Sequence, residues 1–131
     1  MYLKNYEAVN EAIESIDADN YRDFLLLAVD AGPIQKMFIQ RLTREINGKV
    51  IDFLSIRDVI IKNDERGKHI FSNILSKLED KHIPIMVDDI INDKLDQHLM
   101  NNGYISYNHI KNGTKTRSRY KLGKFNFNGR S

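Results

Sequence analysis

The stretch IRDVIIKNDERGKHIF, residues 56–71, decides the fold that we predict for this chain. The β-branched run from Ile56 to Lys62 predicts a strand, and the apolar stripe from Ile70 to Lys81 has the spacing of a helix that packs on a sheet. Between them lies a basic turn that contains one glycine, Arg66-Gly67-Lys68. Because such a turn presents free backbone N–H groups and the positive end of a helix dipole, we predict that it binds a phosphate or pyrophosphate.

A β-hairpin precedes this junction. Asn47-Gly48 is a strong two-residue hairpin signal, with one alternating strand over residues 37–44 and a return strand that begins at Lys49. The apolar pattern of the return strand shifts phase, which predicts a β-bulge near residues 55–58.

The remaining segments alternate between helix and strand signals. Their order predicts an α/β fold, in which residues 1–131 form a single domain with a mixed central sheet flanked by helices. The other expected elements are a helix over 5–16, a strand or helix over 24–29, a strand over 83–87, a helix over 93–102 between Asn92 as N-cap and Gly103, and a final hairpin with strands over 104–109 and 119–127.

Size and composition restrict the class of protein. The chain has 131 residues, of which 41% are hydrophobic and 29% charged, as in one globular domain. The longest apolar run, residues 24–29, is too short to span a bilayer, and the N-terminus lacks the apolar core of a signal peptide. The absence of cysteine excludes disulfides, a thiolate nucleophile and a cysteine-based zinc site. We therefore expect a cytoplasmic protein without a membrane partner.

The charges are unevenly distributed along the chain. All eighteen acidic residues lie at or before Asp96, whereas residues 97–131 carry seven basic side chains and no acidic one. This split favours an anionic partner, either nucleic acid or the phosphates of a cofactor, at the basic C-terminal hairpin and tail over residues 105–131. A solvated basic tail without a partner is the alternative interpretation.

Four pieces of the sequence resemble the core of the GNAT superfamily, the acetyl-CoA-dependent N-acetyltransferases. They are the strand 56–61, the turn 64–68, the segment 87–92 and Asn102-Gly103-Tyr104, and the resemblance covers about residues 36–110. In that family a bulged strand leads into a turn of pattern Arg/Gln-x-x-Gly-x-Gly/Ala, which binds the CoA pyrophosphate. A helix, a strand and an Asn-led helix that ends in Gly-Phe or Gly-Tyr follow. The resemblance implies a small, divergent GNAT-like fold.

The resemblance also implies where acetyl-CoA would bind. Backbone N–H groups of the bulged strand would hold the thioester, and the turn would hold the pyrophosphate. His69 and Phe71 stand where the family usually has Gly and Gly or Ala, so the chain departs from the pattern at the phosphate-binding turn. The implied cofactor-binding residues are Val59, Ile60 and Ile61 on the strand, Arg66, Gly67, Lys68, His69 and Ile70 at the turn, and Asn92, which would contact the pantetheine or orient the last helix.

Acetyl transfer to an amine requires a neutral amine, a polarised carbonyl group and a proton donor for the departing thiolate. Asp58 and Asp88 are the candidate bases, with Glu65 in the exposed turn a poorer one. Tyr104, Tyr107 or His109 could supply the proton. Many family members carry a general-acid Tyr at the position of Leu99, so that acid is missing here. The expected function is the transfer of an acetyl group from acetyl-CoA to an amine of a protein or small molecule.

A second class of function stays open, that of a catalytically inactive relative. Such a protein would use the basic C-terminal face to bind nucleic acid or a protein partner. The aromatic and basic residues of the last 28 positions resemble a surface for single strands in composition, although alternating aromatics also serve sheet packing. The four histidines show no H-x-x-x-H spacing, and we predict no metal site.

Overall fold

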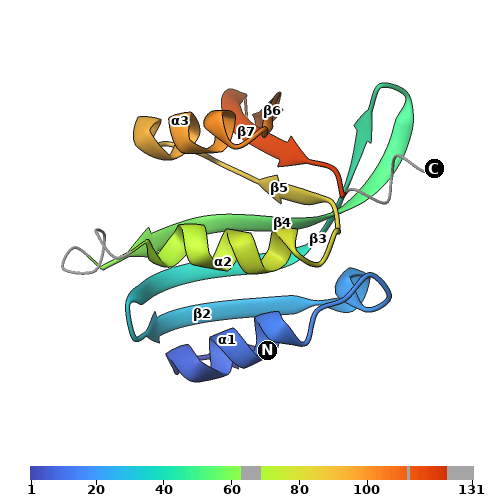
Figure 1. The fold of residues 1–131 in the computed structure, drawn as a ribbon. Helices are drawn as coiled ribbons and strands as arrows, with labels where there is room; N and C mark the ends of the chain where they lie inside the picture. The colour runs from blue at the N-terminus through green and yellow to red at the C-terminus, as the bar shows by residue number, and fades with distance from the viewer. Residues whose placement is uncertain (63–68, 112, 124–131) are drawn as a thin grey trace.

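The computed structural model describes residues 1–62, 69–111 and 113–123. These residues form one mixed sheet of seven strands in the order β1-β2-β3-β4-β5-β7-β6, together with three α-helices (Figure 1). The predicted α/β class with a mixed central sheet is confirmed. The elements are β1 (Tyr2–Leu3), α1 (Tyr6–Glu14), a 3-10 turn (Tyr21–Asp23), β2 (Leu25–Ala31), β3 (Ile34–Ile46), β4 (Lys49–Ile61), α2 (Ile70–Glu79), β5 (Ile85–Val87), α3 (Asp93–Asn101), β6 (Ile105–Lys111) and β7 (Thr114–Lys121).

The long β3–β4 hairpin is the centre of the sheet, and its turn is the predicted one. Asn47 and Gly48 have φ angles of 51° and 83°, the left-handed pair that a two-residue hairpin turn requires. The register between the strands shifts where Arg57 faces Phe38 and Ile60 faces Lys36. Asp58, with φ of 56°, lies within this shift, so the bulge overlaps the end of the range predicted for it.

The helices cover one face of the sheet. The larger core packs α1, α2 and α3 against alternate residues of the strands, including Ile39, Ile56 and Val87. A smaller cluster around Phe53 and Met86 lies on the opposite face, where the described residues supply no helix (Figure 1). The helices predicted to flank the sheet therefore all lie on the same side of it.

The structure settles one assignment that the sequence left open and corrects one predicted strand boundary. Residues 25–29 of the run 24–29 belong to strand β2, which pairs with β3 in antiparallel fashion. The second strand of the last hairpin was predicted over 119–127, but β7 begins at Thr114, directly after Gly113, which has φ of 78°. The tight turn at Gly113 lets the strands pair from Lys111 and Thr114 onward, so the predicted boundary was wrong, and residues 124–127 lie outside the described residues.

Two glycines provide a matched test of the packing between α1 and the β2–β3 turn. Gly32 and Gly48 both have positive φ, but a Cβ atom on Gly32 would lie 2.9 Å from Cβ of Tyr6, whereas one on Gly48 would meet nothing within 4 Å. We expect Gly48→Ala to lower the free energy of unfolding by about 1–2 kcal/mol through backbone strain alone. Gly32→Ala should cost about 1–3 kcal/mol more because Tyr6 must move. Urea unfolding of both variants measures the difference, and equal losses would contradict the contact.

Candidate functional site

The parallel strands β4 and β5 separate after a short paired stretch. They pair from Leu54 with Ile85 to Ile56 with Val87, and the N–H of Asp88 then donates to the carbonyl oxygen of Ile56 at 2.9 Å. Beyond that bond the chain leaves β4 and follows β7, because the N–H of Ile90 donates to the carbonyl oxygen of Arg117 at 2.8 Å. An opening is thus formed at the carboxyl ends of two parallel strands, where ligands of α/β proteins commonly bind.

A pocket of about 340 Å³ lies on the helix-covered side, at the C-terminal end of β4. It is bounded by the N-terminal turn of α2 and by the first turns of α3. No acidic side chain lines it among the described residues. Three residues predicted to bind the cofactor are brought together here, namely Ile61, His69 and Ile70. The full lining is Ile61, His69, Ile70, Phe71, Ser72, Lys94, Leu95 and His98.

The start of α2 faces this pocket with its backbone. His69 is exposed and has φ of 57°, and its side chain makes no capping hydrogen bond to the helix. The N–H groups of the first helical turn have no intrahelical partners in any α-helix, and they carry the positive end of the helix dipole. Ile70 and Phe71 pack on the core from the same turn. The arrangement suits an anionic group bound by backbone N–H groups.

A buried carboxylate lies close to the point of strand separation, on the opposite face of the sheet. Asp88 is 6% exposed and accepts hydrogen bonds from the hydroxyls of Ser55 at 2.5 Å and Ser118 at 2.7 Å. The guanidinium of Arg44 lies 4.0 Å from the carboxylate. Both serines are fully buried, so the three side chains form a polar cluster that joins β4, the end of β5 and β7.

Tyr104 lies elsewhere. It belongs to the core beneath the helices, and its hydroxyl donates to Glu79 at 2.7 Å. Burial, the hydrogen bond to Glu79 and the charge of Glu79 raise the pKa of Tyr104 far above its ordinary value. Tyr104 and Asp88 are on opposite faces of the sheet, so the structure does not bring these two predicted catalytic residues together.

The other predicted site residues occupy separate positions. Asp58 is exposed at the bulge, Val59 packs on the helix-side core, and Ile60 is 41% exposed on the other face. Asn92 caps α3 as predicted, since its side-chain oxygen accepts from the N–H groups of Lys94 and Leu95. The predicted phosphate-binding residues Arg66, Gly67 and Lys68 lie outside the described residues.

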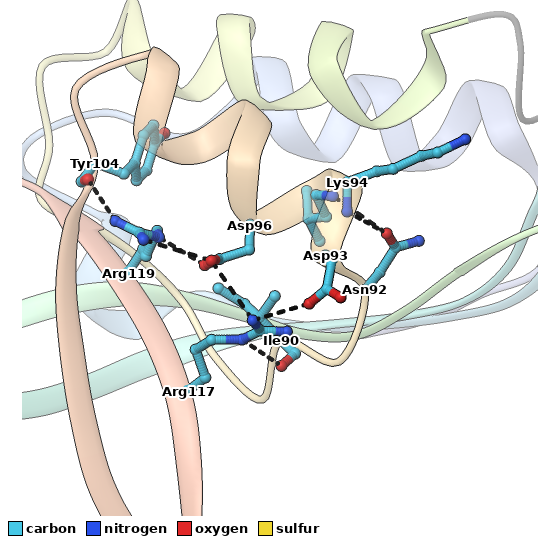
Figure 2. A network of polar contacts seen from close by, with 9 residues as sticks. Ile90, Asn92, Asp93, Lys94, Asp96, Tyr104, Arg117 and Arg119 are labelled. Carbon is cyan, nitrogen blue, oxygen red and sulfur yellow. Dashed lines mark hydrogen bonds and ion pairs between the residues drawn. The ribbon is translucent and has the colours of Figure 1, made fainter.

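The basic strand β7 is paired with acidic residues that are distant from it in sequence. Figure 2 shows Arg119 between Asp96 of α3, at 2.6 Å, and the carbonyl oxygen of Tyr104, at 3.2 Å. Arg117 lies 3.1 Å from Asp93 and also donates to the carbonyl oxygen of Ile90. The uneven charge along the sequence is therefore partly compensated in space, because the acidic first half of α3 lies on the basic strand.

Several residues that shape the site were not predicted. Ser55 could have been noticed as a single polar residue within the apolar run 53–56, but Ser118 and Arg44 carry no local signal for a buried cluster. On α3, His98 lies three residues after Leu95 and four residues after Lys94, so the three side chains share the helix face that lines the pocket. This shared face is apparent only once the side of α3 that meets the pocket is known.

Comparisons with known proteins provide no relative for this chain. No protein-family model matches the sequence, and no curated protein or solved structure matches the chain. Within the described residues, no helix is long and apolar enough to cross a membrane, and no three His, Asp or Glu side chains are grouped as metal ligands.

The polar cluster generates a prediction about stability. Asp88→Ala removes the acceptor of two buried hydroxyls, and we expect a loss of about 1–3 kcal/mol in the free energy of unfolding for each hydroxyl left without an equivalent bond. The triple change Asp88→Ala, Ser55→Ala and Ser118→Ala should recover part of this loss, because no buried hydroxyl then remains. Urea unfolding of the single and triple variants measures the coupling. Strictly additive losses would contradict the cluster.

The Asp96–Arg119 pair generates a prediction about pH. The hydrogen bond from Arg119, with the charges of Arg119 and Arg117, outweighs burial and holds the pKa of Asp96 below its ordinary value. The resulting stability is present above the unfolded pKa of about 3.9 and is lost as the pH falls through the lower folded pKa. Asp96→Asn should therefore lose less stability between pH 5 and pH 2 than the wild type does. Arg119→Gln should have the same effect, since it removes the cause, and a wild-type pH dependence in both variants would refute the pair.

Proposed function

We propose that this chain is a small GNAT-like acetyltransferase that binds acetyl-CoA and transfers the acetyl group to an amine. The observation that carries the proposal is the separation of β4 and β5 beside a pocket at the N-terminal turn of α2. The bulge in β4 lies at the same level, as the resemblance in sequence implies.

The geometry of His69 supports the cofactor site. His69 stands where the family usually has Gly, and its φ of 57° is in the left-handed region that glycine prefers. His69 thus has a backbone conformation that a glycine at this position would also favour, although its side chain differs. Lys94 and His98 on α3 add one positive charge and one further hydrogen-bonding group to the same pocket, which suits the phosphates of CoA.

Asp88 is the base in this proposal. The thioester would lie in the opening between β4 and β5, with its carbonyl group held by backbone N–H groups of Val59 to Ile61, and the amine would approach from the face on which Asp88 lies. Asp88 accepts the proton of the amine, and the same proton is then available to the departing thiolate. Tyr104 has no part in this step, because its hydroxyl is held by Glu79 on the other face.

The alternative of nucleic-acid binding through the basic C-terminal face is less well supported. Arg117 and Arg119 form ion pairs with acidic residues of α3, and Lys121 lies 3.9 Å from Glu79. These three of the seven C-terminal basic residues are thus committed to contacts within the protein.

Thermal unfolding with and without acetyl-CoA tests the cofactor site. A ligand at one hundred times its dissociation constant adds about 2.7 kcal/mol to the free energy of unfolding, which raises the melting temperature of a domain of this size by several degrees. Lys94→Glu should abolish the shift because it places a carboxylate in the pocket, while ATP at the same concentration controls for general anion binding. No shift at millimolar acetyl-CoA, or an equal shift with ATP, would refute the site.

The transfer step has its own test. Release of free CoA in the presence of a panel of amines should be detected for the wild type. Asp88→Asn should lower the rate about 10²–10⁴-fold without changing the melting-temperature shift produced by acetyl-CoA. An unchanged rate would remove Asp88 as the base but would leave the cofactor site standing.

A further inference from the structure

The face of the sheet opposite the helices has a composition of its own. We refer to it as the open face; it consists of the strand side chains that share a side with Phe38, Ser55 and Met86. Register pairing places Gln40 beside Ser55 and Arg57 beside Phe38 on this side. The described helices contribute nothing to it, since all three pack on the other face (Figure 1).

The charged side chains of the open face are almost all positive. Alternation along β3 and β4 places Lys36, Arg44, Lys49 and Arg57 there. The carboxylate that bonds to Ser55 on this face is that of Asp88. It is buried and held by two serine hydroxyls, so it contributes little negative surface. The open face therefore presents a positive potential to solvent.

Three cations of this region are stacked on aromatic rings. The guanidinium of Arg57 lies 4.8 Å from the ring centroid of Phe38, and that of Arg44 lies 5.9 Å from the ring centroid of Tyr107. At the sheet edge, the ammonium of Lys4 lies 5.6 Å from the ring of Tyr2, which pairs in register with Leu27 of β2 and is 60% exposed. These pairs extend from β1 to β6, so they are spread across the whole width of the sheet.

The chemistry of the face selects among classes of partner. A second copy of the chain would bring like charges together. An apolar protein surface would cover Lys36, Lys49 and Arg57 without offering them a partner, which costs free energy. A single-stranded nucleic acid matches the face, because its phosphates pair with the cations and its unpaired bases stack on half-exposed aromatic rings and guanidinium planes. We infer that the open face binds single-stranded nucleic acid.

This inference does not depend on the proposed acetyltransferase activity, and from the C-terminal segment 105–131 it uses Tyr107 rather than the basic side chains. Phosphates would contact Lys36, Lys49 and Arg57, while bases would lie over Phe38 and Tyr107. Gln40, which is half-buried on the strand next to Ser55, carries a donor and an acceptor that can reach base edges. A duplex hides the faces of its bases, so the open face favours single strands over duplexes.

Fluorescence anisotropy with labelled 12-nucleotide strands tests the inference. The probes are oligo(dT), oligo(rU) and a duplex of the same length, titrated with the full chain at several salt concentrations. If three cations contact phosphates, the logarithm of the affinity should fall with the logarithm of salt with a slope of about −2, which is about −0.7 per phosphate. Arg57→Gln should weaken binding and make the slope shallower by about 0.7.

A matched pair of isosteric changes separates the open face from general charge. Gln40→Glu adds one negative charge on the open face and should weaken binding about tenfold. Gln97→Glu adds the same charge on the exposed surface of α3, on the helix-covered side, and should leave binding within twofold. Phe38→Leu keeps every charge, so a loss of affinity with an unchanged salt slope would report stacking. Thermal unfolding shows whether each variant is folded.

Each result bears on the inference. Binding to single strands that is lost in Arg57→Gln and Gln40→Glu, but kept in Gln97→Glu, supports it. No binding at micromolar protein in 50 mM salt overturns it. Equal losses in the two Gln→Glu variants, or tighter binding to the duplex, overturn it as well. Equal binding of poly-L-glutamate, used as a competitor, overturns it in favour of an acidic protein partner.

Discussion

The right-handedness of parallel strand connections determines how this molecule is layered. The connections from β1 to β2 and from β4 to β5 each join two neighbouring parallel strands, and both move along the sheet in the same direction. The connection from β5 to β6 moves in that direction too, and β6 is parallel to β5 because β7 between them is antiparallel to both. Because such crossovers are almost always right-handed, all three helices lie on one face. The covered face therefore holds the large apolar core, and the other face is left to polar and half-buried side chains.

The second constraint is the early separation of β4 and β5. Three residue pairs join β4 and β5. Beyond them the chain that follows β5 bonds to β7, so the edge of β4 no longer forms hydrogen bonds with it. Asp88 marks the separation, and its bonds to Ser55 and Ser118 tie the two sides of the opening together. The pocket beside α2 and the buried carboxylate lie on opposite faces of the sheet at this separation, so the proposed cofactor and acceptor would approach it from different sides.

Much of the fold followed from signals that are local in sequence. The Asn47-Gly48 turn and the Asn92 cap each depend on a few neighbouring residues, and both were predicted correctly. The polar cluster depends on three segments that only the sheet order brings together, so no single segment could predict it. The ion pairs of β7 could not be predicted for the same reason, because the acidic partners of Arg117 and Arg119 lie some twenty residues earlier on α3. The apolar run 24–29 is too short for its pattern to distinguish a strand from a helix. Pairing with β3, which is not visible in the run itself, makes it a strand.

The length of the β3–β4 hairpin has a consequence for how the chain folds. Its strands pair over most of their thirteen residues across a two-residue turn, so the contacts form between residues close in sequence. Closing so short a loop costs little chain entropy, whereas β1 and β5 reach their partners only after whole helices have been placed. We therefore expect this hairpin to be the nucleus on which the sheet grows in both directions. Most of the open face would then form early with the hairpin, whereas the pocket beside α2 would take shape only after α2 and α3 have packed on the sheet.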